Sequence, residues 1–250
     1  MERITSRTNP LCTHIRKLNT SNSYRREQGV FVGEGPKLLE EALKAGSKIS
    51  LVVTAEGTEI SCPSEIRHVE VPADLLASLC DTKTPQGVLF VCKAPETELP
   101  ELTGQRYLVL DGVQDPGNVG TVWRTADAFG ADGLILLGGC ADPCSPKVVR
   151  STMGAVFRLP VYQTNPEQLK AACLRAELPL YATALREDAE ELGRADLSCC
   201  AVVIGSEGRG ISDEMLGLCE KTLKIPMRQR CESLNAAVAA SVILWEGWRA

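Results

Sequence analysis

Apolar runs alternate with helical patterns through the second half of the chain, and no other feature limits the fold as strongly. The runs that predict strands lie at residues 106–110, 133–137, 179–183, 200–204 and 222–225. Patterns that predict helices lie at residues 118–129, 146–154, 166–176, 213–219 and 233–248. Buried strands that alternate with helices are typical of an α/β fold in which helices cover both faces of a parallel sheet. Such a sheet binds ligands in the loops at the carboxyl ends of its strands.

The first half predicts a smaller α/β domain over residues 1–94. Its first 27 residues are polar and helical, and Asn9 is a suitable cap for a helix with Pro10 in the first turn. A further helix is predicted at residues 37–43, and strands at residues 29–32, 50–54, 68–71 and 87–91. Residues 95–105 contain prolines and acids with little apolar content, which predicts a linker to a second domain over residues 106–250.

Charge is distributed unevenly along the chain. The net charge is −5, which argues against a general nucleic-acid binder, and aromatic residues make up only 4%. Residues 1–30 carry six basic side chains against two glutamates, a local charge of +4, so the rest of the chain carries −9. A basic segment on an acidic body predicts contact with phosphate in one region only, and a solvated helix explains the charges equally well. The candidate phosphate contacts are Arg7, Arg16, Arg25 and Arg26.

The 11 cysteines predict free thiols in a reducing cytoplasm. No CxxC pair occurs, and His14 and His68 lie far from the closest cysteine pairs, so we expect no metal site. No apolar run approaches the roughly 18 residues that a membrane span needs, so we expect no membrane contact.

A loop rich in glycine and proline follows the predicted strand at 106–110. It runs from Asp111 to Arg124 and would let the backbone approach a ligand closely. Asn118 can cap the following helix, and Arg124 lies six residues later. Taken alone, this segment slightly favours a cap followed by a surface arginine.

A second loop, from Gly205 to Gly210, has the order G-x-x-G-x-G after a strand. The dinucleotide fingerprint has a different order, and a Walker lysine is absent, which disfavours an oxidoreductase and a nucleotide hydrolase. Glu207 would repel a phosphate, so a ligand with a cationic or hydroxyl-rich part fits better. Alone, the motif is a weak signal, and a glycine-rich turn also explains it.

The third loop runs from Ile225 to Asn235. Ser233 is a suitable cap for the final helix. Asn235 would then lie just inside the helix, where its low helix propensity suggests a functional role. A polar helix entry is the simpler interpretation of this loop by itself.

Together the three loops resemble the SpoU (TrmH) family of SPOUT methyltransferases over residues 107–245. The first carries the family's N-x-G and downstream arginine, the second G-x-E-G-x-G, and the third I-P-M followed by S-L-N. Residues 4–10 and 29–43 resemble, more loosely, the family's L30e-like substrate-binding domain. The one small departure is Ala236, where many members carry valine.

This resemblance implies transfer of a methyl group from S-adenosylmethionine to a ribose 2′-hydroxyl of RNA, with ribosomal RNA expected as the substrate. It also implies a deep trefoil knot in the second domain and a homodimer packed through the knotted region. The final helix could supply the dimer face, and packing within one chain explains its apolar residues equally well. The alternatives are a transfer-RNA 2′-O-methyltransferase and an inactive RNA-binding protein of the same fold.

The resemblance also assigns site residues. Arg124 is expected to be essential, and because a guanidinium stays protonated, it would act on the hydroxyl electrostatically or position a phosphate. The residues expected to assist it are Asn118, Glu207, Ser233 and Asn235. Cofactor contacts are expected from Thr183, Gly205, Gly208, Ile225, Met227 and Leu234.

Overall fold

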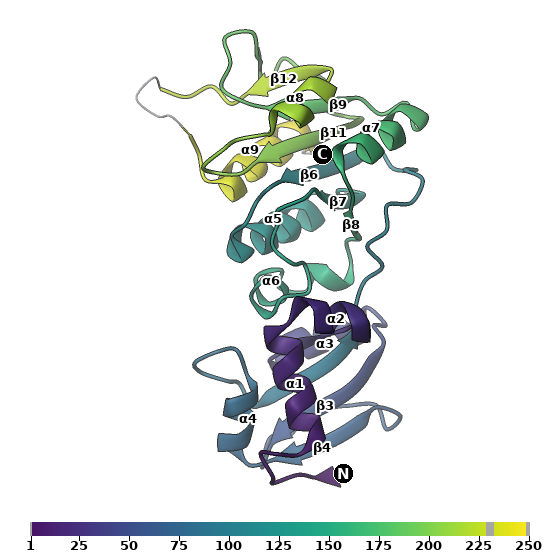
Figure 1. The fold of residues 1–250 in the computed structure, drawn as a ribbon, viewed down its shortest axis with the longest axis vertical. Helices are drawn as coiled ribbons and strands as arrows, with labels where there is room; N and C mark the ends of the chain where they lie inside the picture. The colour runs from purple at the N-terminus through teal and green to yellow at the C-terminus, as the bar shows by residue number, and fades with distance from the viewer. Residues whose placement is uncertain (1, 229–232, 249–250) are drawn as a thin grey trace. The chain divides into compact units, whose positions relative to one another are not determined.

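The computed structural model describes residues 2–228 and 233–248 (Figure 1). Contacts divide the chain into two compact units. The first unit comprises residues 1–95 and 142–157, and the second unit comprises residues 96–141 and 158–250. No helix in the described part of the chain is long and apolar enough to cross a membrane.

A five-stranded mixed sheet forms the centre of the first unit, in the order β1-β4-β3-β5-β2. Its strands are β1 (Glu2–Arg3), β2 (Val30–Glu34), β3 (Ile49–Ala55), β4 (Arg67–Val71) and β5 (Val88–Lys93). Its first four helices are α1 (Pro10–Thr20), α2 (Asn22–Gln28), α3 (Pro36–Lys44) and α4 (Ala73–Leu79). The predicted strands and the predicted helix at 37–43 are confirmed within two residues at either end. The short elements β1 and α4 were not predicted.

Helix α1 begins where the sequence predicts. The side chain of Asn9 accepts a hydrogen bond from the backbone N–H of Leu11 at 2.9 Å, and Pro10 occupies the first turn. Ile15 and Leu18 are fully buried in the core of the first unit. The helical region predicted over residues 1–27 is two helices, because Ser21 is extended and caps α2.

Residues 142–157 belong to the first unit although the chain on both sides belongs to the second. They form α6 (Pro146–Ser151), shorter than the predicted 146–154, and a 3₁₀ turn (Ala155–Phe157). The Phe157 ring stacks on Phe31 with centroids 6.1 Å apart and lies 6.4 Å from Phe90. At the other end of the segment, the partly buried Asp142 forms an ion pair with the buried Arg25.

The second unit is built on a seven-stranded sheet in the order β10-β12-β9-β11-β6-β7-β8, and every neighbouring pair is parallel. The strands are β6 (Arg106–Asp111), β7 (Gly133–Leu136), β8 (Val161–Gln163), β9 (Leu180–Thr183), β10 (Glu190–Glu191), β11 (Cys200–Gly205) and β12 (Lys221–Lys224). The predicted parallel sheet is thus confirmed. The edge strands β8 and β10 were not predicted.

Four helices of the second unit pack against this sheet or against each other. They are α5 (Pro116–Ala128), α7 (Pro166–Arg175), α8 (Asp213–Leu218) and α9 (Ala236–Trp248). Leu169 of α7 and Met215 of α8 share one buried cluster with Val109 of β6 and Val203 of β11. Leu108, on the opposite face of its strand, is equally buried. Helices α5 and α9 contact each other, and they also contact β7 and β11 respectively.

The domain limits at residues 94 and 106 stay predictions, as does the trefoil knot. Within the predicted linker, Leu102 is buried in the core of the second unit. The carbonyl of Thr97 accepts a hydrogen bond from the N–H of Gln163 at 2.7 Å. This part of the segment is therefore packed against the second unit.

Candidate active site

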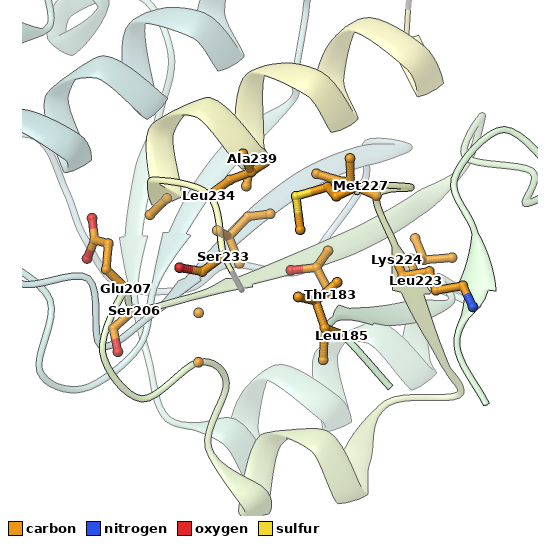
Figure 2. A pocket seen from close by; sticks show the side chains of 16 residues that line it. Thr183, Leu185, Ser206, Glu207, Leu223, Lys224, Met227, Ser233, Leu234 and Ala239 are labelled. Carbon is orange, nitrogen blue, oxygen red and sulfur yellow. The ribbon is translucent and has the colours of Figure 1, made fainter. Parts of the chain in front are cut away.

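A cavity of about 300 Å³ lies at the carboxyl ends of β9, β11 and β12, next to the start of α9. Figure 2 shows Ser206 and Glu207 at one end of the cavity, and Leu223 and Lys224 at the other. Of the six residues expected to contact a cofactor, the structure brings five to the cavity wall: Thr183, Gly205, Ile225, Met227 and Leu234. Gly208 is not part of the wall.

The second motif folds into a tight hairpin at the cavity. Ser206 and Gly210 exchange two backbone hydrogen bonds, at 3.1 and 2.9 Å. A Cβ atom on Gly205 would lie 2.2 Å from the carbonyl carbon of Gly210 and 2.3 Å from the nitrogen of Ile211. Only glycine therefore lets the hairpin fold back on the end of β11. The hairpin holds Glu207 at the end of the cavity.

Side-chain hydrogen bonds join the three motifs. Nδ2 of Asn118 donates to the Glu207 carboxylate, and Nδ2 of Asn235 donates to Oδ1 of Asn118 at 3.1 Å. We call this the Glu207–Asn118–Asn235 network. The three loops thus meet at one place, as the combined pattern in the sequence suggested.

The direction of these hydrogen bonds is fixed by the start of α9. Oδ1 of Asn235 accepts from the backbone N–H groups of Ala237 at 3.0 Å and Val238 at 3.3 Å. Its Nδ2 must therefore point to Asn118, whose own Nδ2 is left to donate to Glu207. Each amide in the network has one workable orientation, and the Glu207 carboxylate is the final acceptor.

Two of the predicted helix starts are wrong. The final helix begins at Ala236, and Asn235, rather than Ser233, has its side chain bonded to the first N–H groups. The low helix propensity of Asn235 is therefore what a cap position favours. Helix α5 is capped by Asp115, whose Oδ1 accepts from the N–H of Asn118 at 2.9 Å. Pro116 suits the first turn, so the helix starts early and the Asn118 side chain is free to join the network.

Arg124 is placed differently from the other expected catalytic residues. It is exposed on α5, and it lines neither this cavity nor the hollow described next. It makes no ion pair with the residues that the structure describes. Ser233, by contrast, lines the cavity.

An open hollow of about 470 Å³ lies between α5 and α9. Asn118 and Asn235 form part of its wall, so the network borders both the hollow and the cavity. Val238 and Trp245 also line it and are 49% and 55% exposed. The Trp245 ring meets Phe129 edge-on, with centroids 6.0 Å apart.

The structure also reveals site residues to which the sequence assigned no role. Leu185 and Lys224 line the cavity, and Leu185 is 54% exposed. Asp111, at the end of β6, does not line the cavity, but it is buried and accepts a hydrogen bond at 2.8 Å from the N–H of Ser212, just after the hairpin. Its position at the carboxyl end of a predicted strand is the sequence feature that could have identified it. No group of three or more metal-ligating side chains gathers anywhere in the described residues.

The four arginines expected to bind RNA are not equivalent. Arg25 is buried and paired with Asp142, so its charge is unavailable to a phosphate. Arg7 is exposed and paired with Asp74, and Nη1 of Arg16 donates to the carbonyl of Arg7 at 2.9 Å. Arg26 is exposed. Arg25 is therefore not among the residues proposed to bind RNA.

Comparison with known proteins places the chain in a family. The sequence model of the SpoU rRNA Methylase family matches residues 105–245, more than half of the chain. The chain belongs to the SpoU rRNA methylase family. A second family model, the MRM3-like substrate binding domain, matches residues 9–89. The resemblance noted in the sequence is thus confirmed for both halves of this SpoU-family chain.

Relatives of this SpoU-family chain match it over nearly its full length. The 23S rRNA (guanosine(2553)-2′-O)-methyltransferase of Bacillus subtilis is 34% identical, over 98% of this chain and 98% of that protein. A 23S rRNA (uridine(2479)-2′-O)-methyltransferase of Streptomyces viridochromogenes is 29% identical, over 99% of this chain and 92% of that protein. An AdoMet-bound rRNA methyltransferase from Sinorhizobium meliloti superposes with a TM-score of 0.88 at 31% identity, over 98% and 97% of the two chains.

Proposed function

We propose that this protein transfers a methyl group from S-adenosylmethionine to a ribose 2′-hydroxyl of ribosomal RNA. The observation that carries the proposal is the Glu207–Asn118–Asn235 network, because it joins the three family motifs beside one cavity. Full-length relatives named as 23S rRNA 2′-O-methyltransferases support the reaction and the class of RNA. Their names give different target nucleotides, and ribosomal RNA is the substrate class that they share.

The cavity fits S-adenosylmethionine in size and chemistry. Its volume of about 300 Å³ suits a small cofactor, and its wall is mostly apolar with backbone groups at strand ends, as an adenine ring requires. A carboxylate at one end favours the cationic sulfonium and disfavours a phosphate-bearing nucleotide. The lysine at the other end provides a partner for a carboxylate. Thr183, Gly205, Ile225, Met227 and Leu234 would hold the cofactor.

The residues of this chain would supply position and electrostatics. Bound S-adenosylmethionine provides an electrophilic methyl group. Glu207 and Asn118 would orient the ribose, because a fixed carboxylate accepts and a fixed amide donates hydrogen bonds to hydroxyl groups. Holding a weak nucleophile in line for attack accounts for a large part of such a rate enhancement. Arg124 would interact with the hydroxyl or an adjacent phosphate as a permanent cation.

We also propose a homodimer that covers the hollow between α5 and α9. Val238 and Trp245 expose apolar surface there, and a second copy would remove it from water. The position of Arg124 supports this proposal, since the arginine lies outside the cavity of its own chain. For Arg124 to act in methyl transfer, either the RNA must lie along α5 or the arginine must act together with a second copy of the chain. The ten described cysteines are all free, which supports a reducing compartment such as the cytoplasm.

The decisive experiment is methyl transfer to large-subunit ribosomal RNA that lacks 2′-O-methylation. The protein and isotopically labelled S-adenosylmethionine should yield label in 2′-O-methylated nucleosides after complete digestion and mass spectrometry. Label in base-methylated nucleosides, or preferential labelling of transfer RNA, would overturn the proposal. Calorimetry with the cofactor distinguishes the enzyme from the remaining alternative, an inactive RNA-binding protein of the same fold. That protein could bind RNA without binding S-adenosylmethionine.

A further inference from the structure

Met153 combines two properties that do not favour folding. Its side chain is 53% exposed, although it is a large apolar residue. Its backbone has a φ of +49°, in the left-handed region that residues with a Cβ atom rarely adopt. Among the described residues, only Met153 and Glu177 have positive φ without being glycine. A residue kept in such a position is a candidate for a functional role.

The fold does not require methionine at this turn. Met153 follows the end of α6, and its N–H donates to the carbonyl of Arg150 at 3.3 Å. Glycine is the residue most often found in the left-handed position after a helix. Thr152 before it and Gly154 after it are buried. The turn therefore projects one apolar side chain into solvent between buried neighbours.

Two cationic side chains lie on the short helix that precedes Met153. Lys147 and Arg150 are on α6, six and three residues before Met153. Nη1 of Arg150 donates to Asp81 at 3.1 Å, with the two side chains 40% and 42% exposed. Exposed pairs of this kind are weak, and a guanidinium has five N–H donors, so Arg150 can also bind a phosphate.

An apolar side chain beside cations matches the chemistry of an unpaired nucleotide. A base offers a flat aromatic face next to a phosphate, and the methionine thioether makes favourable contacts with aromatic rings. The low aromatic content of the chain limits the other stacking partners available. We propose that Met153 packs against an unpaired base of the RNA substrate while Lys147 and Arg150 bind the adjacent phosphates. This inference rests on the proposed function, which makes RNA the substrate.

The test uses Met153→Gly in the full chain and a labelled single-stranded oligoadenylate as the probe. Because glycine relieves the left-handed backbone, the melting temperature should stay the same or rise. Loss of the half-buried contact should weaken oligoadenylate affinity by about fivefold. A lower affinity in a variant of equal or greater stability separates a contact with RNA from a structural role. Met153→Leu should retain the affinity.

Glu177→Gly is the matched control. Glu177 also follows a helix, has a φ of +52°, and donates from its N–H to a carbonyl three residues earlier at 3.3 Å. It precedes β9, at the edge of the sheet opposite the cavity. This variant should gain the same backbone relief and keep full oligoadenylate affinity.

Salt dependence distinguishes the two kinds of contact. Removing the charges in Lys147→Ala/Arg150→Ala should reduce the slope of log affinity against log salt by about 1 to 2. Met153→Gly should leave that slope unchanged. The inference is overturned if Met153→Gly binds oligoadenylate as tightly as the wild type. If the wild type itself binds no RNA and methylates none, the proposed function fails instead, and the two failures are distinguishable.

Discussion

Asn235 donates a hydrogen bond to Oδ1 of Asn118 at 3.1 Å, although 117 residues separate the two in the chain. The same Asn235 side chain accepts from the first N–H groups of α9. The oxygen of one amide thus caps the start of a helix, and its nitrogen orients an active-site residue. Separating these two roles is the most direct way to learn what the network does.

Asn235→Asp should separate them. Aspartate caps a helix as well as asparagine does, so the melting temperature should change little. The variant has no N–H donor for Asn118, and the freed amide can turn away from Glu207. We expect the methyl-transfer kcat/KM to fall by about a hundredfold, a typical effect of small misplacement at a reacting centre. Asn235→Ala should lose the same activity and about 1 kcal/mol of stability. Full activity of Asn235→Asp would show that the network is not needed.

Gly205→Ala should disrupt the cavity, because its Cβ would lie 2.2 Å from backbone that cannot move freely. We expect a loss of roughly 1–3 kcal/mol in stability, as in other overpacked sites. Calorimetry should also show weaker binding of S-adenosylhomocysteine. Gly208→Ala is the control: nothing lies within 4 Å of a Cβ at that position, so its stability and affinity should resemble the wild type. Equal behaviour of the two variants would contradict the role assigned to the hairpin.

Arg124→Ala should abolish methyl transfer and leave cofactor affinity nearly unchanged, since Arg124 lies outside the cavity. Single-turnover assays and calorimetry measure the two effects separately. Arg124→Lys keeps the charge and loses the planar group of donors. Partial activity in that variant would favour a purely electrostatic role. Wild-type turnover of Arg124→Ala would remove Arg124 from the mechanism.

Arg25→Ala should destabilise the first unit far more than Arg26→Ala. Removing Arg25 leaves Asp142 partly buried without its cation, which typically costs about 3–5 kcal/mol. Arg26 is exposed, so its replacement should change stability by less than about 0.5 kcal/mol. If Arg26 contacts RNA, that variant should instead lower RNA affinity and its salt slope. Denaturant titration and RNA binding measure both quantities, and similar stability losses would refute the distinction.

Buried thiols should make the protein unstable in alkali. Burial raises the pKa of the Cys80 and Cys144 thiols to about 12, from an ordinary value of 9.0. A group with a raised pKa in the folded state contributes its full stability below the unfolded pKa, and loses it as the pH rises toward the folded pKa. The free energy of unfolding should therefore fall between about pH 9 and 12. Cys144→Ala should show a shallower decline, and an unchanged slope in that variant would contradict the assignment.

Regular periodicity explains which elements the sequence predicts. The buried strands β6, β7, β9 and β11 are continuous apolar runs, and each was predicted within one residue or so at either end. The helix α4 has seven residues and the strand β8 has three, too few to establish a period. The place of residues 142–157 in the first unit was not predictable, because it depends on the contacts that Phe157 makes with distant rings.

The site residues show a similar limit. Each loop alone also fitted a structural explanation, and only the family resemblance of the three loops together assigned the site residues. The structure brings Asn118, Glu207 and Asn235 together. Spacing alone could not show which side chain caps a helix, so Asn235 was placed inside one. Nor could it show that Arg25 is buried, because charge in a sequence does not reveal whether an acid will pair with it.

The membership of residues 142–157 in the first unit bears on how the protein is made. During synthesis, Phe31 and Phe90 emerge long before Phe157, so their contacts with that ring cannot form until residues 96–141 of the second unit have also left the ribosome. Residues 1–95 alone therefore do not encode the complete first unit. A fragment cut at residue 95 would expose those rings and leave Arg25 without its acid, whereas a coding sequence that runs past residue 157 would supply both.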